Sequence, residues 1–236
     1  MTQSIERRQF LIGSAAGVAA MAATQSPAPA AEAPSTPPLP TASGDVPTYQ
    51  ILTATEVAFL TVMADSMIPA DSLSPSGSDC GVVVFIDRQL AGSFGAGAKL
   101  YRSGPFQPAA AGQGYQLPMT PLEFFRAGIA AADRWSRKTT GKAFDRLGEA
   151  DRVKAMKEME SGKAEFENFN AKAFFAACLQ IVMEGFFSDP IYGGNRDKAS
   201  WRMIGYPGLP ATYADKIEAY RGKRYEAEPQ SIADFS

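Results

Sequence analysis

The sequence predicts an irregular, mainly α-helical domain with long loops, preceded by an N-terminal leader and a linker rich in proline and alanine. Two stretches, Thr53–Glu56 and Thr120–Glu123, open with the reciprocal hydroxyl–carboxylate spacing that caps a helix. Apolar residues after both starts recur at spacings of three and four, as in an amphipathic helix. Only Gly81–Leu90 is rich enough in valine to suggest a buried strand, and the sequence offers no second β-rich stretch to pair with it. We therefore expect this stretch to be helical as well.

The first 30 residues have the pattern of a twin-arginine export signal. The pair Arg7 and Arg8 precedes an uncharged run, Leu11–Ala23. This run has roughly 13 residues, whereas a helix that spans a bilayer needs roughly 20, which argues against a transmembrane anchor. Cleavage sites with small residues lie near residue 22 and near residue 30, and the sequence leaves both open. Export by this route implies a protein that folds before it crosses the membrane.

Residues 31–47 consist mainly of proline, alanine, serine and threonine. Such a stretch buries too little apolar surface to offset the entropy of ordering it, so we expect an extended linker. An extended segment of this kind could also lie as an arm along a partner. The remaining residues, 48–236, are long enough for a single domain with its own core.

The expected helices follow one another along this domain. The first begins after Thr53 and ends at Pro69. A long loop, Gly92–Pro118, then leads to a helix that begins after Thr120 and closes at Gly141. The residues expected to face the core are Leu60, Met63, Ala64 and Met67 in the first helix, and Leu122, Phe125, Ile129, Ala132 and Trp135 in the second.

Besides a short helix that ends at Ile204, three more helices are expected after Gly141. The first, Glu149–Glu160, should turn Val153, Met156 and Met159 inward. The next is capped by Asn170 and runs to Phe187. It has a broad apolar surface formed by Phe174, Phe175, Cys178, Leu179, Ile181, Val182 and Phe186. The last runs from Thr212 to about Arg221.

Composition excludes several kinds of active site. The chain has no histidine and two cysteines, so it cannot form a Ser-His-Asp triad, a haem imidazole ligand or a cysteine-ligated iron–sulfur cluster on its own. Its glycines do not form the Gly-x-Gly-x-x-Gly pattern of a dinucleotide site after a strand. The formal net charge of −2 indicates no nucleic-acid partner. We therefore expect no catalytic, cofactor-binding or metal-binding residues in this chain.

One stretch, Glu184–Gly208, combines tight turns with aromatic and arginine side chains, which are enriched at interface hot spots. Asp189 starts a turn, and Asn195 can cap a short helix that runs to Ile204. The candidate partner-binding residues are Asp189, Tyr192, Asn195, Arg196, Trp201, Arg202 and Tyr206.

These candidates have other interpretations. Most of them could form an internal turn network instead of a contact with a partner, and Trp201 suits a core better than an interface. The carboxylates and tyrosine of the Asp189–Asp197 loop could also serve an independent enzyme or ligand-binding protein. Elsewhere, Asp87 and Arg88 could form a surface ion pair at a helix end.

The two cysteines differ in their surroundings. Cys80 lies in a stretch rich in serine, glycine and proline and is expected to be exposed, whereas Cys178 lies on an apolar helix and is expected to pack as a small hydrophobic residue. In an oxidising compartment they could form one internal disulfide, remain unpaired or bond to another chain. The residues favour the unpaired state, and an intermolecular bond remains an alternative.

Three stretches resemble a known family. Residues 185–197 read Gly-Phe-Phe-Ser-Asp-Pro-Ile-Tyr-Gly-Gly-Asn-Arg-Asp, and residues 200–208 read Ser-Trp-Arg-Met-Ile-Gly-Tyr-Pro-Gly. Together with Phe85–Gly92 and the leader, they resemble the small subunit of gluconate 2-dehydrogenase, also called subunit 3 or gamma. The family commonly has a glycine where this chain has Ser200.

The resemblance implies a non-catalytic small subunit of a heterotrimeric oxidoreductase complex on the periplasmic face of the inner membrane. The partners would be a large flavoprotein subunit that carries FAD and a multihaem cytochrome c subunit that carries haem c. Such a complex oxidises a sugar, a sugar acid or a polyol and passes the electrons to quinone. The small subunit would bring the flavoprotein to the twin-arginine translocase, support its maturation like a chaperone, and touch the membrane only through the complex.

Overall fold

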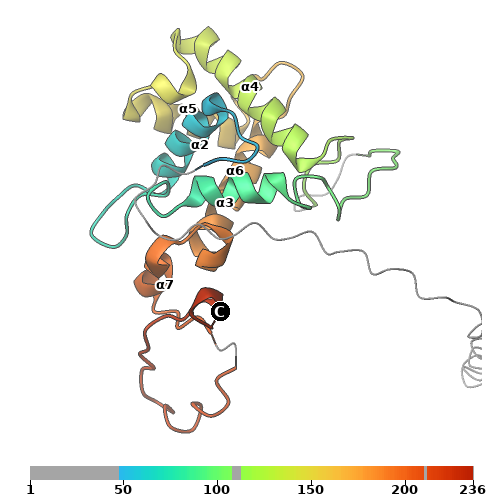
Figure 1. Cartoon of the computed structure of the whole chain (residues 1–236). Helices are drawn as coiled ribbons and strands as arrows, with labels where there is room; N and C mark the ends of the chain where they lie inside the picture. The colour runs from blue at the N-terminus through green and yellow to red at the C-terminus, as the bar shows by residue number, and fades with distance from the viewer. Residues whose placement is uncertain (1–47, 108–112, 210–211, 236) are drawn as a thin grey trace, which may run out of the picture. The chain divides into compact units, whose positions relative to one another are not determined.

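The computed structural model describes residues 48–107, 113–209 and 212–235 (Figure 1). The predicted leader, its Arg7–Arg8 pair and the linker lie outside these residues. Within them the structure has six α-helices and no β-strand, which confirms the mainly helical prediction. The helices are α2 Ala54–Met67, α3 Val82–Ala91, α4 Pro121–Thr140, α5 Glu149–Ser161, α6 Ala171–Phe187 and α7 Ala199–Ile204. Four short 3-10 turns accompany them, η1 Phe144–Arg146, η2 Pro190–Tyr192, η3 Arg196–Lys198 and η4 Ile232–Phe235.

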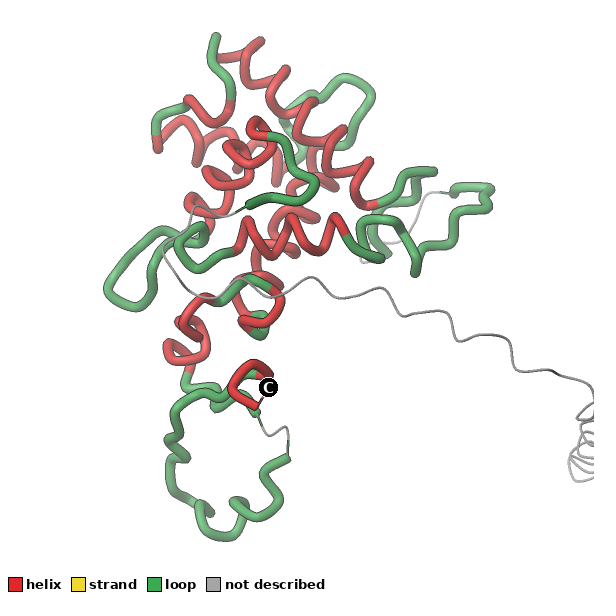
Figure 2. Tube along the Cα trace, viewed as in Figure 1, coloured by secondary structure: helices red, strands yellow, loops and turns green. Residues whose placement is uncertain are grey.

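Helix α6 lies at the centre of the helical body, which we define as α2 to α6. It contacts α2, α3, α4 and α5, and at its far end α7 (Figure 2). A helix with neighbours on several sides must be apolar over most of its circumference. The predicted broad apolar surface of α6 is buried as expected, with the exception of Leu179, which is 40% exposed.

Phe174 of α6 is the centre of the apolar core. Its side chain is fully buried, and its ring centroid lies 6.1–6.5 Å from those of five other phenylalanines. Gly128 of α4 makes room for it, since a Cβ at Gly128 would come within 2.1 Å of the Phe174 ring. Burying one such ring contributes about 1.5–3 kcal/mol. The rings around Phe174 are those of Phe59, Phe124, Phe125, Phe166 and Phe169.

The predicted helix starts and stops are confirmed where local chemistry sets them. Thr53 and Thr120 form complete capping boxes with Glu56 and Glu123. The Asn170 side chain accepts a hydrogen bond from the Ala173 amide at the start of α6. The valine-rich stretch is the helix α3, as predicted, and none of the described helices is long and apolar enough to cross a membrane.

Two predictions about helices are wrong. Residues 212–221 form a succession of turns instead of a helix, because nearly all their side chains are exposed and no apolar stripe is buried to stabilise one. Val153 is 38% exposed, whereas Ala155, Met156 and Met159 are buried. At about 100° per residue, Val153 lies about 120° around α5 from Met159, which places it off the buried row.

The loop between α3 and α4 rests on the start of α4. The Gly95 carbonyl accepts a hydrogen bond from the Leu122 amide. Farther along the loop, the Tyr115 ring stacks on Phe124, with centroids 4.0 Å apart. The described parts of this loop are therefore fastened to the helical body.

Candidate functional site

The candidate site is the turn segment, Asp189–Gly208, which follows α6 directly. Its backbone takes the left-handed conformation at three residues other than glycine, with φ values of 44° at Asn195, 56° at Asp197 and 57° at Lys198. Each such residue costs on the order of 1 kcal/mol and persists only where its surroundings hold it. The contacts of this segment therefore show what holds it.

Asn195 is the central tie of the turn segment. Its side chain is completely buried, donates to the Ser188 carbonyl at 2.9 Å and accepts from both the amide and the hydroxyl of Ser200, at 2.9 and 2.8 Å. It thus joins the end of α6 to the first turn of α7, which ends at Ile204 as predicted. Asn195 was expected to cap this helix, but the N-cap of α7 is Lys198, and Asn195 instead reaches the Ser200 amide in the first turn from three residues before that cap. Ser200, which differs from the common family residue, is buried and bonded here.

Glycines bring the turn segment against the turn before α3. A Cβ at Gly81 would lie 2.4 Å from the Gly193 carbonyl oxygen. Next to Gly81, the Arg196 amide donates to the Cys80 carbonyl at 2.9 Å. On the other side of the segment, a Cβ at Gly194 would lie 2.1 Å from the carbonyl oxygen of Gly185 in α6, so this position also requires glycine. Two stretches that are more than a hundred residues apart in the sequence thus meet backbone to backbone, as only glycine permits.

Trp201 belongs to the core of this region. It is 6% exposed, and its indole N–H donates to the Phe187 carbonyl at 2.9 Å. Its ring meets that of Tyr206 edge to face at 5.1 Å. Tyr206 is exposed, and so are three further candidates for partner contact: Tyr192, which is 50% exposed, Arg196 and Arg202.

The C-terminal residues hold the turn segment from outside. The Asp189 carboxylate accepts one hydrogen bond from the Ile191 amide and another from the Ile232 amide at 2.9 Å. Lys198 donates to the Pro229 carbonyl at 3.0 Å and pairs with Asp234 at 2.6 Å. We call residues 229–235 the clasp, because these contacts fasten it over the turn segment.

Asp234 is the electrostatic centre of the clasp. The hydrogen bond from Lys198, with those from Ser231, lowers the pKa of Asp234 to about 2. The sequence reasoning missed the clasp, although Ser231 and Asp234 have the spacing of a capping pair. That local signal could have indicated a turn, but not its partner Lys198.

Next to the clasp, Arg202 bonds to the Glu228 carboxylate and to the Asp197 carbonyl. Of the predicted partner-binding residues, Asp189, Asn195 and Trp201 are therefore engaged inside the chain. Tyr192, Arg196 and Tyr206 are exposed, although the Tyr206 ring also contacts Trp201, and Arg202 is exposed but paired. Contact with a partner remains a prediction for these four.

Asp87 corrects an expectation. It is 1% exposed instead of forming a surface ion pair, and its carboxylate accepts the amides of Gln50, Ile51 and Leu52 at 2.7, 3.0 and 3.0 Å. Hydrogen bonds to a charged group are worth about 1.5–3 kcal/mol each. Helix α3 thereby holds the beginning of the described chain. The neighbouring Arg88 instead reaches the Ile191 carbonyl in η2, at 3.5 Å.

Both cysteines are free thiols and buried. Cys80, which was expected to be exposed, is 1% exposed. Desolvation, with a smaller contribution from Asp79, raises the pKa of Cys80 to about 11, and burial also raises that of Cys178. A bond from Cys80 to another chain would require the turn before α3 to open.

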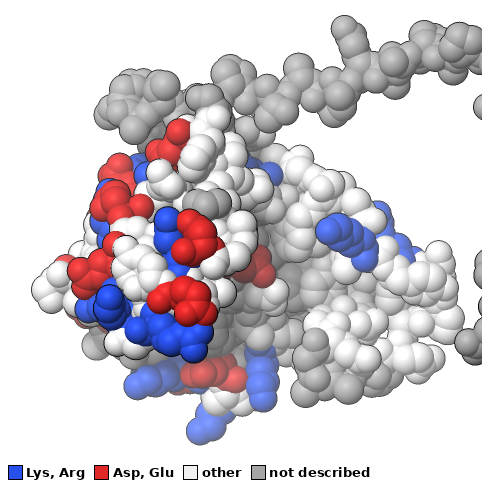
Figure 3. Space-filling view, turned by 90° about the horizontal axis from the view of Figure 1, so that it is seen from below, with Lys and Arg blue, Asp and Glu red and all other residues white. Residues whose placement is uncertain are grey.

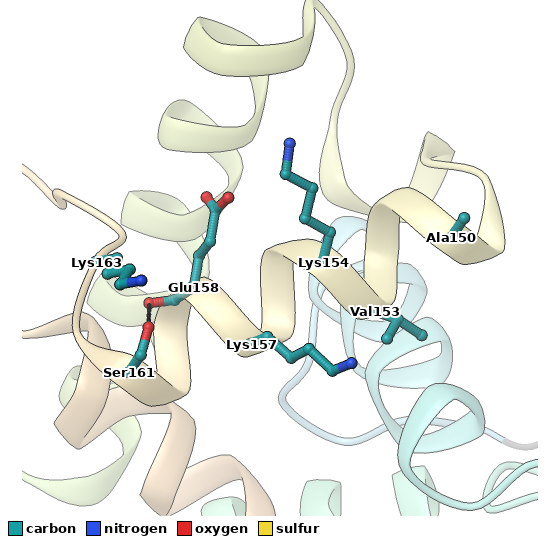
Figure 4. Close-up of a pocket in the computed structure, with 7 residues that line it drawn as sticks. All are labelled: Ala150, Val153, Lys154, Lys157, Glu158, Ser161 and Lys163. Carbon is teal, nitrogen blue, oxygen red and sulfur yellow. Dashed lines mark hydrogen bonds between the residues drawn. The ribbon is translucent and has the colours of Figure 1, made fainter.

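The surface of α5 has a hollow of about 350 Å³ with lysines at its edge. Figure 4 shows that these lysines diverge, since Lys154 points to one side of the helix and Lys157 to the other. They do not surround one point at which an anion could bind. Among the described residues no group of three or more histidine, cysteine or acidic side chains could hold a metal ion.

Comparison with known proteins identifies the family. Neither a curated protein nor a solved structure matches the chain. The family model described as gluconate 2-dehydrogenase subunit 3 matches residues 54–208, which run from the first residue of α2 to the last residue of the turn segment. This match covers more than half of the chain and includes the three stretches that carry the resemblance. The chain therefore belongs to the gluconate 2-dehydrogenase subunit 3 family.

Proposed function

We propose that this chain is the non-catalytic small subunit of a periplasm-facing, FAD-dependent dehydrogenase complex that oxidises a sugar, a sugar acid or a polyol. The family match carries the proposal, because it supports a subunit of a dehydrogenase complex. In this assignment FAD lies in a large flavoprotein subunit and haem c in a cytochrome subunit. The chain escorts the flavoprotein through twin-arginine export and stabilises it.

The geometry of the turn segment supports a surface that binds a protein. Rigid backbone geometry lowers the entropy lost on association, and this segment is fixed by Asn195 and by the clasp. It then presents Tyr192, Arg196 and Tyr206 outward, and tyrosine and arginine are the residues that most often anchor protein interfaces.

The same contacts disfavour an independent enzyme or ligand-binding protein that uses the Asp189–Asp197 loop. Both carboxylate oxygens of Asp189 already accept backbone amides, and Asn195 is enclosed. Asn195 is closed to a ligand, and the Asp189 carboxylate already serves the backbone of this segment.

Export provides the test of the escort. The double variant Arg7→Lys with Arg8→Lys keeps the charge but removes the arginine pair that the translocase reads. We expect both this chain and the flavoprotein to remain in the cytoplasm, as measured by cell fractionation and flavin content. The matched control, Arg102→Lys with Arg146→Lys, changes two exposed arginines of the domain and should leave export intact. A flavoprotein that still reaches the periplasm with the double variant would contradict the proposal.

A further inference from the structure

Exposed apolar side chains are concentrated in the C-terminal part of the molecule. Half of the large hydrophobic residues that are exposed in the described structure, 8 of 16, lie in residues 192–235. Single exposed hydrophobic residues are normal, whereas a concentration of them marks an interaction surface. The eight are Tyr192, Met203, Ile204, Tyr206, Ile217, Tyr220, Ile232 and Phe235.

Two of these residues, Ile217 and Tyr220, lie on a separate element. We define the arm as residues 212–228, which leave the helices beyond α7 and return to them at the clasp (Figure 1). The arm lies beyond residue 208, where the family match ends. The function of the arm is therefore a question that family membership does not answer.

The two ends of the arm are fastened at its base. Gly208 and Gln230 form a parallel β-bridge, in which the Leu209 amide donates to the Gln230 carbonyl at 2.8 Å. A Cβ at Gly208 would lie 2.0 Å from that carbonyl oxygen and 2.9 Å from the ring of Trp201. The base of the arm is thus set by the same buried tryptophan that anchors the turn segment.

Apart from the Tyr213 hydroxyl, which donates to the Gly208 carbonyl, and Glu228, which pairs with Arg202, the arm is held by contacts within itself. The Tyr220 ring meets that of Tyr225 at 4.7 Å, and Tyr213 meets Tyr225 at 5.9 Å, both edge to face. The backbone hydrogen bonds of its turns, such as that from the Tyr220 amide to the Lys216 carbonyl at 3.0 Å, also stay inside the arm. Ile217 takes no part in the tyrosine cluster and is 63% exposed.

These internal contacts offset only part of the cost of ordering the arm. Fixing a backbone costs about 1–2 kcal/mol per residue. An aromatic pair contributes about 0.5–1.5 kcal/mol beyond the area it buries. A second surface that covers Ile217 and Tyr220 would supply the missing apolar burial, at about 25 cal/mol per Å².

The charges on the arm indicate the chemistry of that surface. Its four basic residues are matched by four acidic ones, and Figure 3 shows both signs intermingled on the face of the molecule that the arm occupies. Nucleic acids and anionic membranes attract segments with a net positive charge, which this arm lacks. A folded protein with an apolar pocket and a polar rim of both signs fits it. The charged residues are Asp215, Lys216, Glu218, Arg221, Lys223, Arg224, Glu226 and Glu228.

We propose that the arm is a docking element for the folded flavoprotein subunit, with Ile217 as its principal anchor and Tyr220 beside it. This inference rests on the proposed function, because it takes its partner from there. The turn segment and the arm then contact the partner from one common base at Trp201, so the orientation of the arm is set before the partner binds.

The first experiment uses the complex that the full chain forms in its own host. Hydrogen exchange is measured on residues 212–228 in the complex and in the isolated chain. We expect exchange in the arm to slow at least tenfold in the complex, because a docked interface excludes water from its backbone. The loop at Leu73, which is 68% exposed, serves as the internal reference and should exchange at the same rate in both samples.

A matched pair of variants then tests the anchor. Ile217→Ser and Leu73→Ser each remove one exposed aliphatic side chain, from the arm and from a distant loop. We expect Ile217→Ser to weaken flavoprotein binding about tenfold or more, as for an interface anchor. Leu73→Ser should leave it unchanged. Both variants should unfold at the temperature of the unmodified chain, because neither side chain is packed.

The outcomes separate the two proposals. If no flavin-containing protein is recovered with the chain, the proposed function fails and the role of the arm fails with it. If the complex forms but the arm exchanges as fast as before and Ile217→Ser binds like Leu73→Ser, only the role of the arm is refuted. Protection of the arm in a dimer of this chain, or Ile217-dependent binding to anionic phospholipid vesicles, would also refute it.

Discussion

The helical body and the C-terminal region, residues 189–235, are held together by different means. In the body, Phe174 packs among five aromatic rings and the stabilisation comes from apolar burial. In the C-terminal region, Asn195 and Lys198 hold a strained backbone through hydrogen bonds and one ion pair, and most of the large apolar side chains other than Trp201 are exposed. The helical body thus stabilises the fold, whereas the C-terminal region holds a strained backbone that forms a defined surface.

The largest expected effect is in the body. Phe174→Ala should lower the free energy of unfolding by about 4 kcal/mol, because it opens a cavity among rings that Gly128 and its neighbours cannot fill. Urea denaturation measures it. Leu179→Ala, on the exposed face of the same helix, should cost less than about 0.5 kcal/mol. Equal losses for the two variants would contradict the central place of Phe174.

A smaller and local effect is expected in the turn segment. Asn195→Ala should destabilise this segment by about 2 kcal/mol, because the Ser188 carbonyl and the Ser200 amide lose their buried partner. Hydrogen exchange should accelerate in residues 189–208 and stay unchanged in α4. Gln180→Ala, which removes an exposed amide from α6, is the control and should accelerate neither region. Acceleration of both regions by Asn195→Ala would show that they unfold as one unit.

The smallest effect is a dependence on pH in the clasp. The pKa of Asp234 is lowered in the folded chain, from 3.8 to about 2, first by Lys198 and then by Ser231. A lowered pKa stabilises the folded form fully above the unfolded value. The contribution is therefore complete above about pH 4 and is lost as the pH falls towards about 2.

Hydrogen exchange in residues 229–235 measures this loss. We expect exchange there, corrected for its intrinsic dependence on pH, to accelerate between about pH 4 and about pH 2. Asp234→Asn should show the faster exchange already at neutral pH and lose the acid transition. An acid transition that persists in Asp234→Asn would assign it to another carboxylate.

Sequence reasoning predicted what short-range chemistry determines. The starts at Thr53, Thr120 and Asn170 depend on hydrogen bonds between residues three apart, and all three are as expected. The same logic failed at Thr212, where the capping spacing to Asp215 is present but no apolar row is buried behind it. A cap can start a helix, but packing must stabilise it.

The sequence indicated where the candidate site lies but not which contacts hold it together. The turns and aromatic residues identified the segment, whereas its internal ties connect residues that no spacing rule relates. Lys198 pairs with Asp234, which lies 36 residues away in the sequence, and the Asp189 carboxylate accepts a hydrogen bond from the Ile232 amide, 43 residues away. Asn195 was predicted to cap a short helix and to contact a partner or join an internal turn network, and the fold encloses it in such a network. Such contacts depend on tertiary structure and leave no local pattern.

The hydrogen bonds of Asp87 also determine how the molecule bears a mechanical load. A pull on the chain at its N-terminal side reaches residues 50–52 before it reaches α2. There three amides bond to one carboxylate in α3, a helix packed against α6. We therefore expect such a load to fall on these three hydrogen bonds before it reaches α2. The anchor lies within α3, so the load enters the helical body and not the C-terminal region.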